Sequence, residues 1–386
     1  MLSRQIAQKL RGYETPFYLY DMALLRQTLE SVVYESKRYG YHLHYAIKAN
    51  YDNRILEVIR EYGLGIDCAS GNELRKAIES GFNPRQIVYA GVGKRDKELR
   101  YAIEQKILAI NVESIEELHL VNRLSAEAGT TTDVALRINP DIDPKTNHCI
   151  DTGQADSKFG ISYEEILDEA ETLKTLSNIN IIGIHLHIGS QIRELHVFEN
   201  MCNKVNVIVE NLESLGFSFR FVDVGGGLGV NYDVPENEPI PNFASLFSII
   251  HNYLSVGDKE VHFEFGRAIV AECGELITSV LFNKTTATGR RLVIVDASMT
   301  ELIRPALYGS YHNIENITSE ESINSKYTIV GTACESTDVF QENVSMKRTK
   351  RGDLIAIKSA GAYGMSMASR YNLHDLPGAV YSDQIE

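Results

Sequence analysis

The sequence is poor in basic residues and has no long apolar run. Of its 386 residues, 38 are lysine or arginine and 52 are aspartate or glutamate, which gives a formal net charge of −14. Nucleic acids and anionic membranes bind extended positive surfaces, so neither is an expected partner. No segment approaches the roughly 20 apolar residues of a membrane span, and residues 1–15 lack the apolar region of a signal peptide. We therefore expect a soluble, unprocessed protein.

Cysteine is also scarce. The five cysteines stand at positions 68, 149, 202, 273 and 334 and include no CxxC pair. This spacing fits neither a disulfide framework nor a zinc site. A reducing, cytoplasmic location is the simplest interpretation.

The sequence does contain a regular alternation of strand-like and helix-like segments. Helical patterns such as residues 51–61, 114–124 and 197–215 separate eight short apolar segments. The segments are 42–47, 64–68, 87–90, 108–112, 133–138, 181–188, 219–224 and 260–265. Eight such repeats predict a (β/α)8 TIM-like barrel, which we place at residues 24–265.

The length of the chain predicts a second domain. A barrel that ends near residue 265 leaves about 120 residues, too many for a simple tail. From Arg290 onward the pattern changes to short β-rich runs, including 291–295, 327–330 and 353–358, divided by turn residues. We therefore expect a mostly β C-terminal domain of residues 266–386, to which residues 1–23 contribute.

Polar groups gather at the predicted strand ends. In a (β/α)8 barrel the catalytic groups lie at the C-terminal ends of the strands. Those ends carry Lys48, Asp67, Arg137, His187, Gly225–Gly227 and Glu264. One mouth of the barrel is therefore the predicted active site.

Lys48 is the most unusual of these residues, because an ammonium at the end of an apolar strand has no packing role. It could form a structural ion pair with Asp67. Alternatively, a partly desolvated lysine among charged groups can form a Schiff base with an aldehyde cofactor, of which pyridoxal 5'-phosphate is the common example. The residue alone leaves both interpretations open.

Two other strand ends carry groups that this cofactor requires. The strand-to-glycine turn at Gly225–Gly227 can form a phosphate nest, although glycine-rich turns are weak evidence by themselves. Val230 stands where a dinucleotide-binding GxGxxG needs its third glycine, which disfavours that alternative. Glu264 could pair with Arg267, or it could face a pyridine nitrogen and keep it protonated.

His185 and His187 alternate along one predicted strand, so they are expected on the same face. They could be ordinary inward-pointing histidines. His187 could instead stack on a cofactor ring, with Ser190 bonded to its phosphate. A metal would need a third ligand, and none stands out, so no metal is expected.

Together these residues resemble the fold-type III pyridoxal-phosphate decarboxylases, the family of ornithine, arginine and diaminopimelate decarboxylases. The likeness covers nearly the whole chain. Five motifs occur in the family's order, namely Tyr45–Asn50, Ser157–Gly160, His187–Gln191, Gly225–Gly229 and Cys334–Asp338. The resemblance implies an alanine-racemase-like barrel followed by a β domain, with pyridoxal 5'-phosphate as cofactor.

The resemblance also implies roles. Lys48 would bind the cofactor covalently, His187 would stack on its ring, Glu264 would face its nitrogen and Cys334 would donate a proton; these four are the predicted catalytic residues. The other predicted cofactor contacts are Asp67, Arg137, Ser190, Gly225, Gly226, Gly227, Gly266, Arg267 and Tyr363.

Within the family, residues 302–308 and His312 are most similar to the branch that acts on meso-2,6-diaminopimelate. The distal amino acid group of that substrate needs a cation for its carboxylate and an acid for its ammonium, which Arg304 and Glu335 can supply. The predicted substrate contacts are Arg267, Arg304, Tyr308, Glu335 and Tyr363. The implied reaction is decarboxylation to L-lysine and CO2, the last step of lysine biosynthesis. Family precedent places Cys334 and Glu335 at the neighbouring subunit's site, which implies a homodimer.

Alternatives within and beyond the family remain. The chain could be a carboxynorspermidine, arginine or ornithine decarboxylase, or a catalytically silent regulatory homologue. A racemase is disfavoured, because that class places arginine where Glu264 would face the ring. The family's Glu-Pro-Gly-Arg reads with Phe265 in place of proline, which restores an N–H and should cause only local adjustment. Polar residues between 140 and 156 suggest a mobile loop, and Lys158 and Arg137 could be structural supports near the cofactor.

Overall fold

The computed structural model describes residues 4–142 and 157–385 of the chain. The loop expected at residues 140–156 lies, from residue 143 onward, outside the described residues, as does Cys149. The chain forms two compact units, one of residues 29–229 and 242–266 and the other of residues 1–28, 230–241 and 267–386. No helix in the described ranges combines the length and apolar character needed to cross a membrane.

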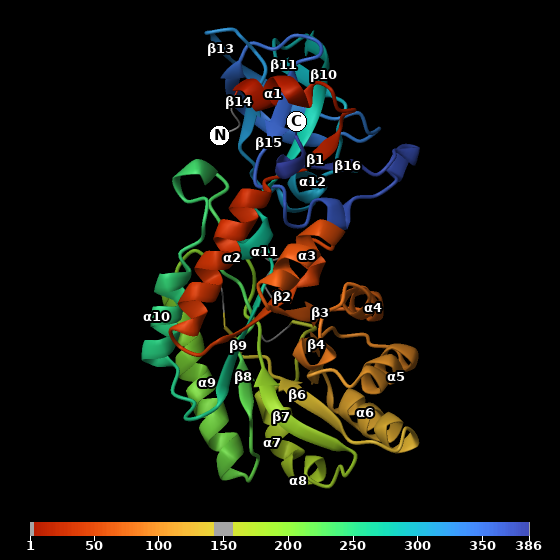
Figure 1. The fold of residues 1–386 in the computed structure, drawn as a ribbon, viewed down its shortest axis with the longest axis vertical. Coiled ribbons are helices and arrows are strands. Elements are labelled where there is room, and N and C mark those ends of the chain that lie inside the picture. The colour runs from red at the N-terminus through yellow and green to blue at the C-terminus, as the bar shows by residue number, and fades with distance from the viewer. Residues whose placement is uncertain (1–3, 143–156, 386) are drawn as a thin grey trace. The chain divides into compact units, whose positions relative to one another are not determined.

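The first unit contains a closed barrel of eight parallel strands surrounded by helices (Figure 1). The predicted (β/α)8 barrel is thereby confirmed. The strands pair in chain order, and β9 closes the barrel against β2. The strands are β2 (His42–Ala46), β3 (Gly65–Cys68), β4 (Ile87–Tyr89), β5 (Ala109–Val112), β6 (Thr132–Arg137), β7 (Ile179–His185), β8 (Phe221–Asp223) and β9 (Glu260–Phe265).

Helices follow the strands, and several begin at a polar cap. Asp52, Ser70 and Ser114 accept backbone N–H groups in the first turns of α3, α4 and α6, which satisfies donors that have no partner within the helix. The helices are α2 (Met22–Lys37), α3 (Asn53–Glu61), α4 (Gly71–Glu79), α5 (Asp96–Gln105), α6 (Ile115–Glu127), α7 (Tyr163–Asp168), α8 (Ala170–Leu173), α9 (His196–Ser214) and α10 (Phe243–Tyr253).

Several strands end earlier than predicted, and at β2 and β7 the difference affects site residues. β2 ends at Ala46, so Lys48 lies on the short 3-10 turn of residues 47–49. β7 ends at His185, so His185 and His187 do not share a strand. Beyond β7 the chain turns through left-handed residues, with φ of 148° at Gly189 and 63° at Gln191, and this geometry cannot continue a strand.

The second unit is built on an eight-stranded sheet, which confirms the predicted β-rich part. Its central order is β12-β15-β10-β11-β13-β14, and β1 joins β10 to β16. The strands are β1 (Phe17–Tyr20), β10 (Gly274–Thr285), β11 (Arg291–Val295), β12 (Ile314–Asn316), β13 (Asn324–Val330), β14 (Val339–Lys347), β15 (Leu354–Ile357) and β16 (Gly378–Tyr381). The helices are α1 (Arg4–Leu10), α11 (Arg267–Val270) and α12 (Arg304–Tyr308). Part of the core consists of Leu10, Phe17, Leu19, Ile277, Leu354 and Ala356.

Phe265, the residue that replaces the family's proline, is a core residue of the barrel unit. It is buried, with its ring centroid 5.5 Å from Phe243 of α10 and 5.5 Å from Phe263 of β9. Its Cα is paired with Tyr45 in the β2–β9 ladder. The substitution therefore exchanges a rigid ring for an aromatic contact between β9 and α10.

Candidate active site

Lys48 and Asp67 form an ion pair at the C-terminal mouth of the barrel. Lys48 Nζ lies 2.7 Å from Asp67 Oδ2, where the Lys48 side chain is 40% exposed and the Asp67 side chain is fully buried. Burial and nearby Glu264 raise the pKa of Asp67, while Lys48 opposes that rise. A structural ion pair and a Schiff-base lysine would both make this contact, so the contact alone does not distinguish the two roles of Lys48. The exposure of the Lys48 side chain keeps it accessible to a ligand.

Glu264, the last residue but one of β9, lies among polar groups from other strands. Its Oε2 lies 3.0 Å from His185 Nε2, and its Oε1 accepts a 3.4 Å hydrogen bond from Asn111 Nδ2. Burial acts to raise the pKa of Glu264, but His185 and Lys48 outweigh burial and hold that pKa below its usual value. Glu264 is therefore an ionised carboxylate that can stabilise a proton on a facing ring nitrogen.

A second buried carboxyl group, Asp223, accompanies Glu264. Burial and the charge of Glu264 raise the pKa of Asp223 well above its usual value. Its Oδ1 accepts the N–H of Gly225 at 2.8 Å. Two adjacent buried carboxyl groups do not both ionise readily, so the negative charge resides on Glu264.

His187 lies in the segment that follows β7. Its Nδ1 accepts the N–H of Gly226 at 3.2 Å. Burial, with the positive charges of Lys48 and Arg137, lowers the pKa of His187 to about 3. The imidazole is therefore neutral at physiological pH with its proton on Nε2, and its flat face can lie against an aromatic ring without adding a second positive charge.

The glycines at 225–227 are required by close backbone approach. An added Cβ would lie 2.0 Å from the carbonyl oxygen of Glu264 at Gly226, and 2.5 Å from that of Leu186 at Gly225. The N–H groups of Gly225 and Gly226 are already bonded to Asp223 and His187. Among the described residues no acceptor faces the N–H of Gly227. Of the three glycine N–H groups, that of Gly227 is therefore the one that can donate a hydrogen bond to a phosphate.

Arg137, at the end of β6, is held inside the protein. Its Nη1 lies 2.5 Å from Glu113 Oε1, and its guanidinium carbon lies 4.6 Å from the centre of the Phe159 ring. Glu113 also accepts the N–H groups of Gly91 and Gly160. These contacts favour a supporting role for Arg137. Lys158 lies beside the same ring, 5.3 Å from its centre.

The β-rich unit contains a separate cluster of predicted substrate residues around Tyr232. Arg267 Nη1 donates to the Tyr232 hydroxyl at 2.7 Å, and Arg304 lies 4.7 Å above the Tyr232 ring. The centre of the Tyr363 ring lies 5.0 Å from the guanidinium carbon of Arg267. The backbone of Tyr363 is left-handed, with a φ of 58° that is uncommon outside glycine. Two buried guanidinium groups thus share one aromatic ring.

His312 fixes the position of Arg304. The Nδ1–H of His312 donates to the carbonyl of Lys358 at 2.8 Å, so its Nε2 accepts from Arg304 Nη1 at 2.9 Å. Burial and the charge of Arg304 lower the pKa of His312 to about 3, which keeps it a neutral acceptor. The described partners of Arg304, Tyr232, His312 and Ser310, are all neutral. A buried cation with neutral partners favours an anionic ligand.

The remaining predicted residues are spread over both units. Cys334 and Glu335 lie on the exposed loop between β13 and β14, where the Cys334 N–H donates to Asn372 and Glu335 accepts from Tyr371. Tyr308 is the last residue of α12. Ser190 lies three residues after His187 in the segment that follows β7, and the buried Gly266 comes directly after β9. The structure therefore does not add Cys334 or Glu335 to the Tyr232 cluster.

Four residues with a clear place in these clusters were not predicted from the sequence. Asn111 bonds Glu264, Asp223 accepts from the glycine turn, Glu113 anchors Arg137, and Tyr232 contacts both arginines. The sequence could have identified Asn111, since it is a polar residue inside the apolar strand β5. No sequence pattern identifies Tyr232, because only the fold brings it to α11 and α12.

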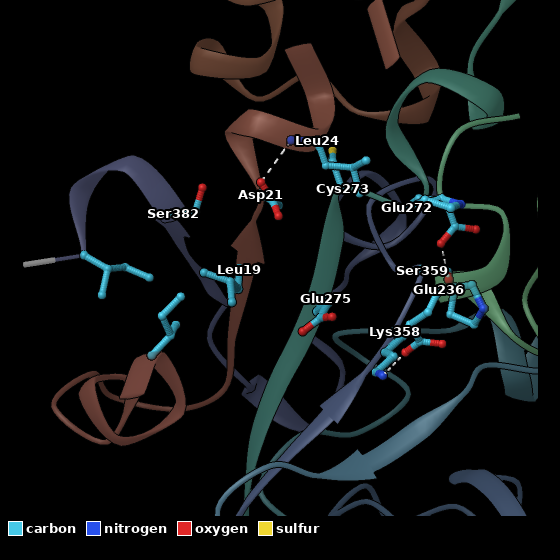
Figure 2. Close-up of a pocket in the computed structure, with 14 residues that line it drawn as sticks. Leu19, Asp21, Leu24, Glu236, Glu272, Cys273, Glu275, Lys358, Ser359 and Ser382 are labelled. Atoms are coloured by element: carbon cyan, nitrogen blue, oxygen red, sulfur yellow. Dashed lines mark hydrogen bonds and ion pairs between the residues drawn. The ribbon is translucent and has the colours of Figure 1, made fainter. Parts of the chain in front are cut away.

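A cavity of about 190 Å³ also lies within the β-rich unit (Figure 2). Its walls carry Asp21, Glu236, Glu272, Glu275 and Lys358 among apolar side chains. Lys358 is bonded to Glu236 and lies 2.9 Å from Glu315. Burial raises the pKa of Glu272 and of Glu275 to about 7.

Comparison with known proteins gives a consistent result. Residues 26–271 match the family described as pyridoxal-dependent decarboxylase, pyridoxal binding domain. The chain is 45% identical over 379 residues to the diaminopimelate decarboxylase of Bacteroides thetaiotaomicron, covering 98% of each chain. The structure of the Helicobacter pylori diaminopimelate decarboxylase complexed with L-lysine is similar with a TM-score of 0.91 at 37% identity, covering 97% of this chain and 93% of that one. An arginine decarboxylase of Paramecium bursaria Chlorella virus, at 22% identity and a TM-score of 0.86, shows only the shared fold.

Proposed function

Because the chain belongs to the pyridoxal-dependent decarboxylase family, we propose that it converts meso-2,6-diaminopimelate to L-lysine and CO2, the last step of lysine biosynthesis. The full-length similarity to diaminopimelate decarboxylases supports this substrate. The observation that carries the assignment within the structure is Arg304, a buried cation with neutral described partners, because the distal carboxylate of this substrate would supply the missing charge.

The residues at the barrel mouth fit pyridoxal 5'-phosphate. Lys48 offers an accessible amine, Glu264 an ionised carboxylate, and Gly225–Gly227 a turn that any Cβ would obstruct. When bound, this cofactor withdraws the electrons left behind as the α-carboxylate departs as CO2.

We assign the proton chemistry of the barrel to three residues. Asp67 Oδ2, 2.7 Å from Lys48 Nζ, can take the ammonium proton and so leave the amine nucleophilic; its raised pKa suits that role. Glu264 would hold a proton on the ring nitrogen of the bound cofactor. Neutral His187 would cover the ring without contributing a competing charge.

Substrate discrimination is assigned to the cluster around Tyr232. Arg304 would pair with the distal carboxylate of the substrate, and Arg267, Tyr308 and Tyr363 would contact the substrate nearby. Substrates without that carboxylate would leave Arg304 buried and unneutralised. Ornithine and arginine lack it, which is why their decarboxylation is not the favoured function.

We further propose a cytoplasmic homodimer in which Cys334 and Glu335 complete the neighbouring subunit's site. In this assignment the Cys334 thiol delivers its proton to the α-carbon after CO2 has left, and Glu335 binds the distal ammonium. The exposed position of both residues on one loop supports the proposal, and the free, unbridged state of the described cysteines fits a reducing compartment.

The direct test is CO2 release by the cofactor-loaded protein, with meso-diaminopimelate, L-ornithine, L-arginine and carboxynorspermidine supplied in parallel. We expect activity on meso-diaminopimelate alone, with L-lysine as the second product. Activity confined to another substrate would keep the fold and cofactor but reject the substrate. A coloured protein inactive on all four would support the regulatory alternative.

A further inference from the structure

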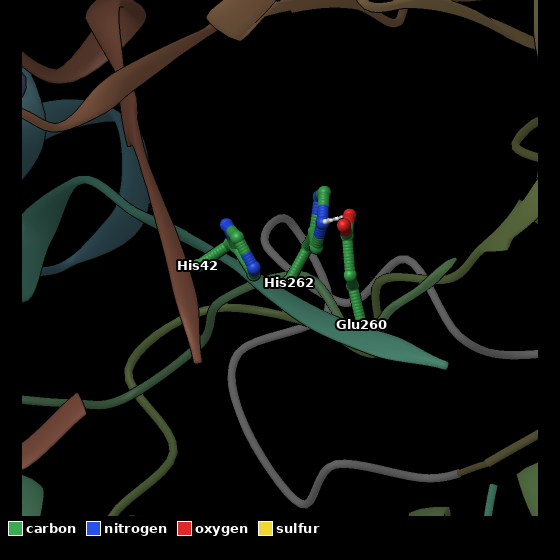
Figure 3. A group of neighbouring side chains, drawn as sticks. All are labelled: His42, Glu260 and His262. Atoms are coloured by element: carbon green, nitrogen blue, oxygen red, sulfur yellow. Dashed lines mark hydrogen bonds and ion pairs between the residues drawn. The ribbon is translucent and has the colours of Figure 1, made fainter. Parts of the chain in front are cut away.

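Three metal-ligating side chains meet at the opposite end of the barrel from Lys48, at the N-terminal ends of β2 and β9. His42 opens β2, Glu260 opens β9, and His262 follows Glu260 on the same face (Figure 3). Parallel pairing places His42 directly opposite His262. One nitrogen or oxygen from each residue lies within 4.8 Å of the other two. The cluster arises because the barrel closes between its first and last strands.

The geometry of the cluster is close to that of a tetrahedral metal site. In such a site, metal–ligand bonds of about 2.0–2.1 Å put neighbouring ligand atoms about 3.4 Å apart. The distance from His262 Nε2 to Glu260 Oε2 is 3.2 Å, so this edge is already formed. His42 is exposed at the start of its strand, so its side chain is free of tight packing, and one of its ring nitrogens lies within 4.8 Å of the other two ligand atoms.

The hydrogen bond on the far side of His262 suits a metal ligand. His262 Nδ1 lies 3.1 Å from Nε2 of the buried His44. If the His262 proton is on Nδ1 and is donated to His44, the Nε2 lone pair points toward Glu260. The lone pair and the Glu260 carboxylate are then two adjacent electron-pair donors, and a cation between them would bind both. A buried partner that fixes the ring of a histidine ligand is the usual second contact of protein metal sites.

We propose that His42, Glu260 and His262 form a binding site for a divalent transition metal such as Zn2+, independent of the decarboxylation site. Two imidazoles and one carboxylate are a common zinc donor set, and a water would complete the coordination. The site opens into a cavity of about 490 Å³, and the Glu260 side chain is 42% exposed, so a metal can enter from solvent.

A hydrogen bond from His262 Nε2–H to Glu260 would also satisfy that pair without a metal. It would leave the third group of the cluster, His42, with no role; its ring is tilted against His262 at a centroid distance of 4.8 Å. Arg220 is the competing cation, with Nε 4.0 Å from Glu260 Oε2. The metal must displace this weak ion pair, which makes Arg220 a useful probe.

A metal here would cross-link the seam of the barrel. It would join residue 42 to residues 260 and 262, which belong to the two strands that meet only when the barrel is complete. Because the ligand atoms are brought together by folding, metal binding would stabilise the folded barrel in proportion to its affinity.

The experiment is a zinc titration of the cofactor-loaded protein in competition with a fluorescent chelator, together with thermal unfolding at each zinc concentration. The variants are His42→Ala, His42→Gln, Glu260→Gln and Arg220→Gln, and the matched control is His119→Ala, which removes an exposed histidine elsewhere on the barrel unit. Circular dichroism and decarboxylase activity verify that each variant is folded.

We expect one zinc per chain that binds at least tenfold more weakly in His42→Ala, His42→Gln and Glu260→Gln, unchanged in His119→Ala and tighter in Arg220→Gln. Zinc should raise the melting temperature only where this affinity is retained. Wild-type affinity in either His42 variant or in Glu260→Gln would overturn the proposal, because the three ligands must act together.

Discussion

The Lys48 amine and the Asp67 carboxylate lie 2.7 Å apart at the barrel mouth, where the Asp67 side chain is fully buried and the Lys48 side chain is partly exposed. The contact serves both interpretations of Lys48, since a structural ion pair and a poised nucleophile need the same partner. Substitutions that keep the charge but remove the chemistry can separate the two.

Lys48→Arg should abolish CO2 release and covalent cofactor attachment while retaining most of the thermal stability. Arginine preserves a cation beside Asp67, but its guanidinium does not deprotonate to become a nucleophile. Activity, the cofactor's visible absorbance with and without borohydride, and the melting temperature measure the three properties. Lys48→Ala, which removes the charge as well, is the comparison. Turnover by either variant would reject Lys48 as the covalent attachment point.

Arg304→Ala should raise KM for meso-diaminopimelate and lower kcat/KM by at least about 30-fold, because losing one partner of a buried charge pair costs about 2–5 kcal/mol. Steady-state kinetics measure both parameters. Arg370→Ala removes an exposed arginine of the same unit and should leave them unchanged. An unaltered KM in Arg304→Ala would mean that the distal carboxylate binds elsewhere.

Glu275→Gln should stabilise the protein at pH 8 and have little effect at pH 4.5. Burial raises the pKa of Glu275 from 4.5 to about 7, so the folded state holds a proton that the unfolded state loses between these values. A raised folded pKa gives stability that is present below pH 4.5 and is lost as the pH rises through 7. Glutamine is neutral throughout, so its gain in melting temperature should grow over this range.

The control for this prediction is Glu321→Gln, which neutralises an exposed carboxylate. Its effect on the melting temperature should be small and nearly independent of pH. Equal pH profiles for the wild type and Glu275→Gln would contradict the prediction, because they would mean that folding does not raise the pKa of Glu275.

A heterodimer of one Lys48→Ala chain and one Cys334→Ala chain should be far more active than either parent variant. If Cys334 acts in the neighbouring subunit, one of the two sites in this heterodimer has both residues, which gives about half of the wild-type rate. Chains with two different affinity tags allow it to be purified and assayed. No recovery would indicate that Lys48 and Cys334 act within one chain.

Cys334→Ala alone should keep the cofactor's colour but lose most of kcat.

The barrel and the β-rich unit were predictable because their signals are local. Eight apolar segments with helical patterns between them suffice for the barrel, and the motif around Lys48 identifies the family. Strand ends were less predictable: His187 leaves β7 because Gly189 and Gln191 adopt left-handed backbone, which no periodicity reveals. The three-ligand cluster was invisible for a different reason. His262 reads as part of an apolar strand, and only closure of the barrel places it beside His42, 220 residues earlier in the chain.

The contact of Gly226 with Glu264 has a consequence for how this enzyme can change. A Cβ at Gly226 would lie 2.0 Å from the backbone oxygen of Glu264. The turn proposed to meet the phosphate and the residue proposed to meet the ring nitrogen are therefore mechanically coupled. A mutation that displaces the glycine turn from the phosphate would also move Glu264, the residue proposed to keep the ring nitrogen protonated. Adaptation to new substrates is easier at the Tyr232 cluster, where side chains can change without moving this backbone.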